Sequence, residues 1–282
     1  MAWRETAAQA VAGAVVQDTR VYTLGPLIHN PKVLESLKER GVICLAEDDI
    51  SSLPQNSTVI IRAHGVSPAV EKALAGRGAA VIDATCPHVK ISQSKTRDFA
   101  EKGYRIFLAG EENHGEITGI LGYIEPPCSP DAIPSCYVVG DPMEAERAAN
   151  ELFRLEPGAK TVLIGQTTIS TGEYSAIGER LRRVFPALEI LDTICNATAK
   201  RQEALRELCG QVDAIVVAGG RESANTRRLL SLARELGKPA WLVQAPEDLP
   251  PEIAAYKTVG LSAGASTPDS LIVEIEERLE AL

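Results

Sequence analysis

The chain has 282 residues, of which 45% are hydrophobic and 24% charged, as in ordinary globular proteins. A net charge of −9 argues against general affinity for nucleic acid or anionic membranes. No apolar run is long enough to span a membrane, and the N-terminus lacks the layout of a signal peptide, so the sequence predicts a cytoplasmic protein without a membrane partner.

Helices and strands alternate along the first third of the chain. An Ala-rich helix is predicted over residues 4–17, and further helices begin at Pro31 and Pro68. The short apolar runs predict strands over residues 21–25, 42–45, 59–62 and 79–83. This order is typical of α/β layers with parallel strands.

The rest of the chain continues this alternation. A helix follows Cys86, a second helix follows Cys195, and a Pro-rich insert interrupts residues 125–135. Strands are predicted over residues 104–109, 136–139, 161–164, 189–192, 214–218, 240–243 and 258–262. A final helix covers residues 268–279, so the strand that would close the last unit is expected to lie before Met1.

The sequence contains an internal repeat. At one constant offset and without a gap, the middle of the chain aligns with a later part. Three of the aligned pairs are identical: Cys86 with Cys195, Ala109 with Ala218 and Gly110 with Gly219. Two further pairs are polar in both copies: His114 with Ser223 and Glu116 with Asn225. A third copy places His29 on His114 and Met1 at the cysteine position. We therefore expect three pseudo-symmetric α/β lobes, over residues 1–84, 85–193 and 194–282, with mostly parallel sheets in a trefoil arrangement around a central cavity.

Polar side chains follow the predicted strands at their carboxyl ends, where ligands bind in sheets of this kind. They are His29, His64, Cys86, His114, Glu116, Thr167, Cys195, Ser223, Asn225 and Ser266. Imidazole, hydroxyl and amide donors suit a diphosphate, although the turns themselves contain no lysine or arginine. A structural interpretation remains open, in which the histidines are satisfied core residues and Ser223, Asn225, Ser266 and Glu116 cap helices.

Six cysteines occur in a chain without an export signal, which favours thiols or metal ligands over disulfides. No two have the CxxC spacing, so a metal site would need cysteines from separate repeats. Cys44, Cys136 and Cys209 have apolar neighbours and are expected to be buried thiols. Cys86 and Cys195 could also be thiols at helix starts without a metal.

Motifs across nearly the whole chain resemble one family, the 4-hydroxy-3-methylbut-2-enyl diphosphate reductases of non-mevalonate isoprenoid synthesis (LytB/IspH type). They are VYTLGPLIHNP, IIRAHGVSP, VIDATCP, NHGEITGILGY, QTTIS, ICNAT, RQEAL, SANTRRL and SAGASTPD. The resemblance implies three lobes that each provide one cysteine to a central iron–sulfur cluster, [4Fe-4S], with Cys86 and Cys195 as two of the ligands.

The resemblance also implies roles for the other polar residues. His29, His64 and His114, with Ser223, Asn225 and Ser266, correspond to the diphosphate-binding set. Thr167 and Glu116 correspond to the pair near the substrate hydroxyl, so Glu116, Thr167 and His114 are the implied catalytic residues, and Thr167 also contacts the substrate.

Two departures from the family pattern stand out. The family's first ligand lies in a Gly-Phe-Cys motif, whereas this chain begins Met1-Ala2-Trp3-Arg4 and lacks the Gly-Val pair that should follow. The third protein ligand is therefore missing or replaced, and Cys128 in the Pro-rich insert is a candidate substitute. Gly115 stands where most members carry proline.

These features lead to one hypothesis and two alternatives. The hypothesis is an iron–sulfur reductase that removes the hydroxyl of an allylic diphosphate to give isopentenyl and dimethylallyl diphosphate, with electrons from ferredoxin or flavodoxin. One alternative is a divergent homologue that binds an isoprenoid-type diphosphate with altered or no redox activity. The other is an N-terminally cut form of a normal reductase.

Overall fold

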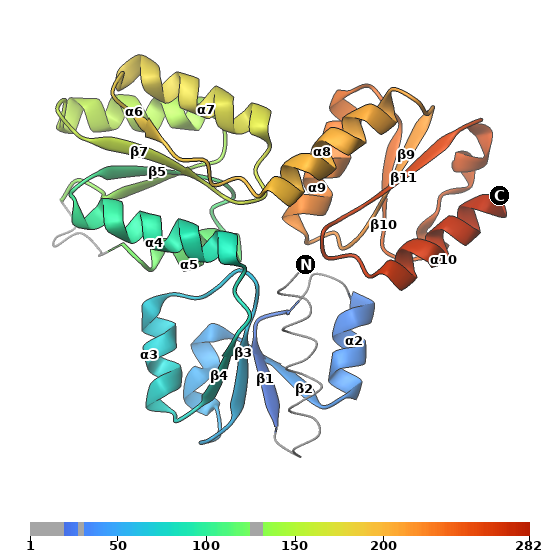
Figure 1. Cartoon of the computed structure of the whole chain (residues 1–282), viewed down its shortest axis with the longest axis horizontal. Helices are drawn as coiled ribbons and strands as arrows, with labels where there is room; N and C mark the ends of the chain where they lie inside the picture. The colour runs from blue at the N-terminus through green and yellow to red at the C-terminus, as the bar shows by residue number, and fades with distance from the viewer. Residues whose placement is uncertain (1–19, 28–30, 125–131) are drawn as a thin grey trace. The chain divides into compact units, whose positions relative to one another are not determined.

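The computed structural model of the chain describes residues 20–27, 31–124 and 132–282 (Figure 1). The helix predicted over residues 4–17, together with Met1, His29 and Cys128, lies outside these ranges. Within the described ranges, no helix is both long and apolar enough to cross a lipid bilayer.

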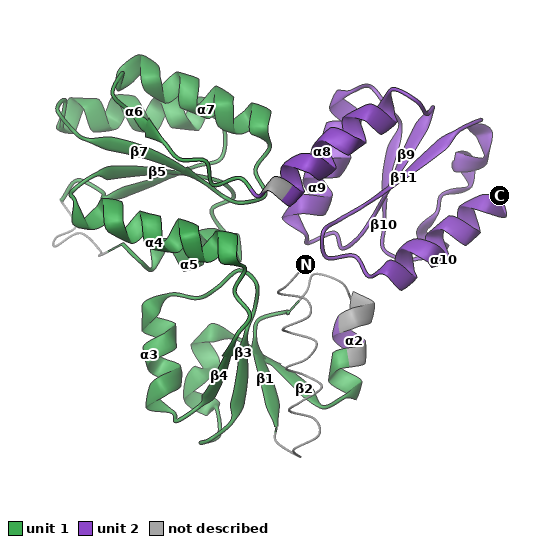
Figure 2. Cartoon of the chain, viewed as in Figure 1, with its two compact units in different colours: residues 1–27, 37–194 green, residues 28–36, 195–282 purple. Residues whose placement is uncertain are grey.

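The chain divides into two compact units (Figure 2). One comprises residues 1–27 and 37–194, and the other comprises residues 28–36 and 195–282. The described residues form two sheets in the first unit and one in the second. The predicted lobe boundaries, after residues 84 and 193, stay a prediction.

The first sheet has four parallel strands in the order β2-β1-β3-β4. They are β1 (Val21–Leu24), β2 (Val42–Leu45), β3 (Thr58–Ile61) and β4 (Ala80–Asp83). The helical elements connecting these strands in sequence are α2 (Pro31–Glu39), the 3₁₀ helix η1 (Glu47–Ser52) and α3 (Pro68–Gly76). Alternate residues of the central strands enter two apolar clusters, because successive side chains of a strand point to opposite faces.

The second sheet has the same order, β6-β5-β7-β8, and is also parallel. Its strands are β5 (Arg105–Ala109), β6 (Cys136–Val139), β7 (Thr161–Gly165) and β8 (Glu189–Ile190). Helices α4 (Pro87–Glu101) and α5 (Gly115–Leu121) cover one face, and α6 (Pro142–Leu155) and α7 (Thr171–Val184) cover the other (Figure 1). Central strands buried on both faces explain why β5 and β7 are almost wholly apolar.

The third sheet has three described strands in the order β10-β9-β11, again parallel. They are β9 (Ala214–Ala218), β10 (Ala240–Val243) and β11 (Val259–Ala263). The helical elements are α8 (Asn196–Cys209), α9 (Ala224–Glu235), α10 (Asp269–Glu280) and the 3₁₀ helices η2 (Pro246–Asp248) and η3 (Pro251–Ala255). The strand expected before Met1 is not among the described residues and stays a prediction.

The α/β class with parallel sheets is confirmed, and the strands β1, β5 and β9 occupy equivalent central positions. The repeat extends to the turns, because His114 is the N-cap of α5 and Ser223 is the N-cap of α9. One prediction about the cysteines was wrong. Cys44 is exposed because β2 is an edge strand, on which the neighbouring Ile43 is also 43% exposed.

Two glycines of the second sheet's α5 segment lie against the first sheet's turn before α3. A Cβ added to Gly122 would lie 2.2 Å from the Cβ of Ser67, the N-cap of α3. A Cβ added to Gly119 would lie 3.4 Å from the carbonyl oxygen of His64. Within the first unit, the two sheets are therefore in close backbone contact beside the turn that carries His64.

Candidate functional site

Two of the predicted histidines contact each other in the first unit. His64 follows β3, and His114 follows β5, at the carboxyl ends of these strands. Their ring centroids are 4.8 Å apart with an interplanar angle of 67°, an edge-to-face contact. The backbone N–H of Glu116 donates to Nδ1 of His114 at 3.2 Å, which places the proton of a neutral His114 ring on Nε2.

The carboxylate of Glu116 is held by Thr167. The Thr167 backbone N–H donates to Oε1 at 2.7 Å, and its hydroxyl donates to Oε2 at 2.8 Å. Glu116 lies at the start of α5, and Thr167 follows β7, the strand that pairs with β5. Glu116 is 1% exposed, so a buried carboxyl group is fixed in one orientation directly beside the histidine pair.

The sequence analysis assigned no role to Gln166, although the residue lies in the QTTIS motif. It is fully buried, and its Oε1 accepts the Glu111 backbone N–H at 3.0 Å. Its Nε2 donates to the Thr168 hydroxyl at 3.0 Å. Gln166 thus joins the turn after β5 to the turn after β7 and supports the positions of Glu116 and Thr167. The sequence could have indicated this role, because Gln166 is a polar residue directly after the largely apolar strand β7.

Cys86 is half-buried at the N-terminus of α4, just after β4. Its backbone N–H donates to the carbonyl of Ala63, the residue before His64, at 2.9 Å. The preceding Asp83 accepts the Thr85 backbone N–H at 2.9 Å and pairs with Lys90 Nζ at 2.5 Å. These contacts fix the backbone of the cysteine relative to the histidine turn.

Asp83 should contribute stability that depends on pH. Burial alone would raise its pKa, but hydrogen bonds from Lys90 and Thr85 outweigh burial and hold the pKa below its ordinary value. A depressed pKa stabilises the fold at neutral pH, and the contribution disappears as the pH falls through the folded-state pKa. We expect Asp83→Asn to reduce the free energy of unfolding at pH 7 by no more than about 1 kcal/mol, since the ion pair is partly exposed.

Urea unfolding of both proteins at pH 7 and at about pH 3 would measure this effect. The difference between wild type and Asp83→Asn should be larger at the higher pH than at the lower one. An equal difference at both pH values would show that the carboxylate charge is not responsible.

The second unit carries the remaining predicted donors. Ser223 is the N-cap of α9 and Asn225 lies in its first turn, just after β9, and Ser266 follows β11. Because β11 pairs with β9 in register, with Ala263 opposite Ala218, both turns lie at one edge of the sheet. Ser223 caps α9, as the structural interpretation expected.

Asn225 differs from a simple capping residue. It is 4% exposed, and neither of its side-chain polar atoms has a hydrogen-bond partner among the described residues. Leaving a buried amide unsatisfied is costly, and such groups in native proteins call for an explanation. A bound polar ligand would supply the missing partners.

The structure thus brings His64, His114, Glu116 and Thr167 together in one unit, with Cys86 on a neighbouring turn. Ser223, Asn225 and Ser266 lie together in the other unit, in which Cys195 is a half-buried N-cap of α8. His29 lies outside the described residues. Within the described ranges, no group of three His, Cys, Asp or Glu side chains is arranged to hold a metal ion.

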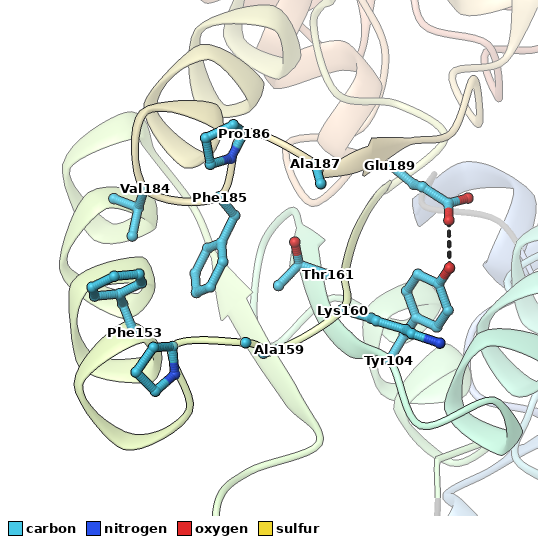
Figure 3. Close-up of a pocket in the computed structure, with 12 residues that line it drawn as sticks. Tyr104, Phe153, Ala159, Lys160, Thr161, Val184, Phe185, Pro186, Ala187 and Glu189 are labelled. Carbon is cyan, nitrogen blue, oxygen red and sulfur yellow. Dashed lines mark hydrogen bonds between the residues drawn. The ribbon is translucent and has the colours of Figure 1, made fainter.

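A cavity of about 430 Å³ lies at the opposite, amino edge of the second sheet (Figure 3). Tyr104, Phe153 and Phe185 line it, and the Tyr104 hydroxyl donates to Glu189 at 2.5 Å. None of the predicted site residues lies there. The cavity is therefore separate from the edge where the polar side chains gather.

The chain is similar to known proteins both in sequence and in fold. The family model described as LytB protein matches residues 5–280. The 4-hydroxy-3-methylbut-2-enyl diphosphate reductase of Treponema pallidum is 44% identical over 92% of this chain and 75% of its own length. The reductase of the same name from Treponema denticola is 42% identical over 92% of this chain and 87% of its own length.

Two solved structures are also similar. The E-1-hydroxy-2-methyl-but-2-enyl-4-diphosphate reductase of Plasmodium falciparum has a TM-score of 0.86 at 26% identity, covering 97% of this chain and 82% of that one. A structure of (E)-4-hydroxy-3-methyl-but-2-enyl diphosphate reductase, the terminal enzyme of the non-mevalonate pathway, has a TM-score of 0.66 at 33% identity. It covers 99% of this chain and 94% of its own.

Proposed function

The chain belongs to the LytB family, and we propose from this membership that it is a 4-hydroxy-3-methylbut-2-enyl diphosphate reductase. The reaction replaces the allylic hydroxyl with hydrogen, consuming two electrons and two protons and releasing water, to give isopentenyl and dimethylallyl diphosphate. The observation that supports it best is the buried Glu116 carboxyl group, oriented by Thr167 beside the His64–His114 pair.

Cys86 and Cys195 would hold the family's iron–sulfur cluster. Each is half-buried at the N-terminus of a helix of 14 or 15 residues, where the helix dipole favours a bound anionic group such as a thiolate-held cluster. Two thiols suit an iron–sulfur cluster, and Cys128, the candidate substitute for the missing ligand, lies outside the described residues. When bound, a [4Fe-4S] cluster supplies electrons and Lewis acidity for cleavage of the carbon–oxygen bond.

Glu116 would deliver a proton to the departing oxygen. The carboxyl group is buried and held in one orientation, as a group that transfers a proton at a fixed atom must be. Thr167 donates to it through its backbone N–H and its hydroxyl, so Thr167 would orient Glu116. With the hydroxyl turned to accept from the protonated carboxyl group, Thr167 would also relay the proton. Gln166 would hold the turn after β5 and the turn after β7 in fixed positions relative to each other.

The diphosphate would be bound by neutral donors. His64 and His114 offer imidazole N–H groups, and His29 would add a third. In the other unit, Ser223 and Ser266 offer hydroxyls, and the unsatisfied Asn225 amide supports a ligand at this edge. Ferredoxin or flavodoxin would provide the electrons in the cytoplasm.

The proposal is tested with protein purified without oxygen and supplied with iron and sulfide. With 4-hydroxy-3-methylbut-2-enyl diphosphate and reduced methyl viologen, we expect two electrons to be consumed for each substrate molecule, with both diphosphate products formed. An iron-loaded protein that binds the substrate without consuming the reductant would instead support a homologue that only binds an isoprenoid-type diphosphate.

A further inference from the structure

A largely buried cation lies at the carboxyl edge of the first sheet. Arg62 directly follows β3, two residues before His64, and its side chain is 14% exposed. Its guanidinium reaches over the end of β1, because a Cβ added to Gly25 would lie 2.6 Å from Nη1. The sequence analysis counted Arg62 in the strand predicted over residues 59–62 and therefore did not include this charge among the turns.

The other side of the same guanidinium packs against the candidate site. A Cβ added to Gly115 would lie 2.6 Å from Nη2 of Arg62. Gly115 lies between His114 and Glu116, and it replaces the proline that most members of the family carry. The glycine leaves room for the guanidinium to pack directly against the backbone of the turn that carries both residues.

The positive charge of Arg62 is only partly neutralised. Among the described residues it forms an ion pair with Glu47, with Oε1 3.6 Å from Nη2, which is longer than a good charge-assisted hydrogen bond. Nε is buried and has no hydrogen-bond partner among the described residues. Burial lowers the pKa of the guanidinium, while Glu47 opposes this effect. A buried cation with so little compensation favours an additional anion nearby.

We propose that Arg62 is a positioning residue of the diphosphate site. Its guanidinium supports the backbone of the His114–Glu116 turn and provides a fixed positive charge that favours a diphosphate beside His64 and His114. This inference rests on the proposed function. It differs from the neutral donor set implied by the family resemblance, which includes no arginine.

Binding of isopentenyl diphosphate, the proposed product, would test this role. In calorimetric titrations of the cluster-loaded proteins, the Arg62→Gln variant should bind isopentenyl diphosphate about tenfold more weakly than wild type, because the variant lacks the guanidinium charge that attracts the diphosphate. Arg62→Lys keeps the charge and should recover most of the affinity. The loss should shrink at high salt if the effect is electrostatic.

Arg77, the C-cap of α3, offers a matched control. It is partly buried, and its Nε donates to the Leu53 carbonyl at 3.0 Å, away from the histidine turns. Arg77→Gln should lower thermal stability and leave the affinity for isopentenyl diphosphate unchanged. If Arg62 had only a structural role, Arg62→Gln would likewise lower thermal stability and leave the affinity for isopentenyl diphosphate unchanged.

Gly115→Ala tests the packing between the turn and the guanidinium. The added methyl group would displace Nη2, so affinity should fall in the wild-type background but change little in Arg62→Gln, whose shorter side chain leaves space. If wild type and Arg62→Gln bound isopentenyl diphosphate equally well, the role of Arg62 would be overturned while the proposed function would stand. Additive effects of Arg62→Gln and Gly115→Ala on this affinity would have the same consequence. A wild-type protein that binds no isopentenyl diphosphate would overturn the proposed function as well.

Discussion

Glu116→Gln is expected to lower kcat for 4-hydroxy-3-methylbut-2-enyl diphosphate by about a hundredfold or more, with the fold retained. Glutamine occupies nearly the same volume, and its amide oxygen can still accept the backbone N–H of Thr167 while its NH2 group donates to the Thr167 hydroxyl, but it has no acidic proton to give to the departing oxygen. Steady-state turnover with reduced methyl viologen would measure the loss, and thermal unfolding would confirm the fold.

Two further variants make this result specific. Thr167→Val removes the hydroxyl but keeps the backbone donor, so it should cost less than Glu116→Gln. Glu112→Gln alters an exposed carboxylate of the same turn and should leave turnover unchanged. Full activity in Glu116→Gln would assign the acid to a different group.

Cys86→Ser and Cys195→Ser are expected to reduce the bound iron and sulfide per chain at least about tenfold under mild chelation, because each removes one of two thiolates proposed as ligands. The serine hydroxyl is a poor iron ligand at neutral pH, and the cluster absorption in the visible range should fade with the iron. Iron and sulfide analysis of anaerobically reconstituted protein would measure the effect.

Cys44→Ser is the matched control for both variants. Cys44 is exposed on the edge strand β2 and is not part of the proposed site, so its replacement should leave the iron content unchanged. If Cys86→Ser or Cys195→Ser retained the wild-type iron content, the assignment of that cysteine as a ligand would be wrong.

Much of the fold was predictable because short apolar runs bounded by glycine and proline leave few choices. Strands over residues 42–45, 136–139, 214–218 and 240–243 were predicted with the bounds that the structure has. His64 and His114 were predicted to follow strands at their carboxyl ends, and the structure places each of them there. Glu116 and Thr167 are joined by a hydrogen bond between neighbouring turns, and their roles at the site stay predictions.

The remaining features depend on tertiary packing. No local pattern shows that β2 is an edge strand, so the exposure of Cys44 could not be predicted. Gln166 and Arg62 act through side chains that reach neighbouring turns, and their partners lie far along the chain. The short 3₁₀ helices, such as η1 (Glu47–Ser52), complete the connections between strands and carry no apolar periodicity.

The close approach of Gly122 to Ser67 makes function vulnerable at a place remote from any reacting group. A methyl group at residue 122 would clash with Ser67 and force the α5 segment away from the α3 segment. The imidazole rings of His64 and His114 would then separate, because His64 precedes α3 and His114 precedes α5. A screen for inactive but well-expressed variants should therefore recover substitutions at this glycine alongside those at the histidines themselves.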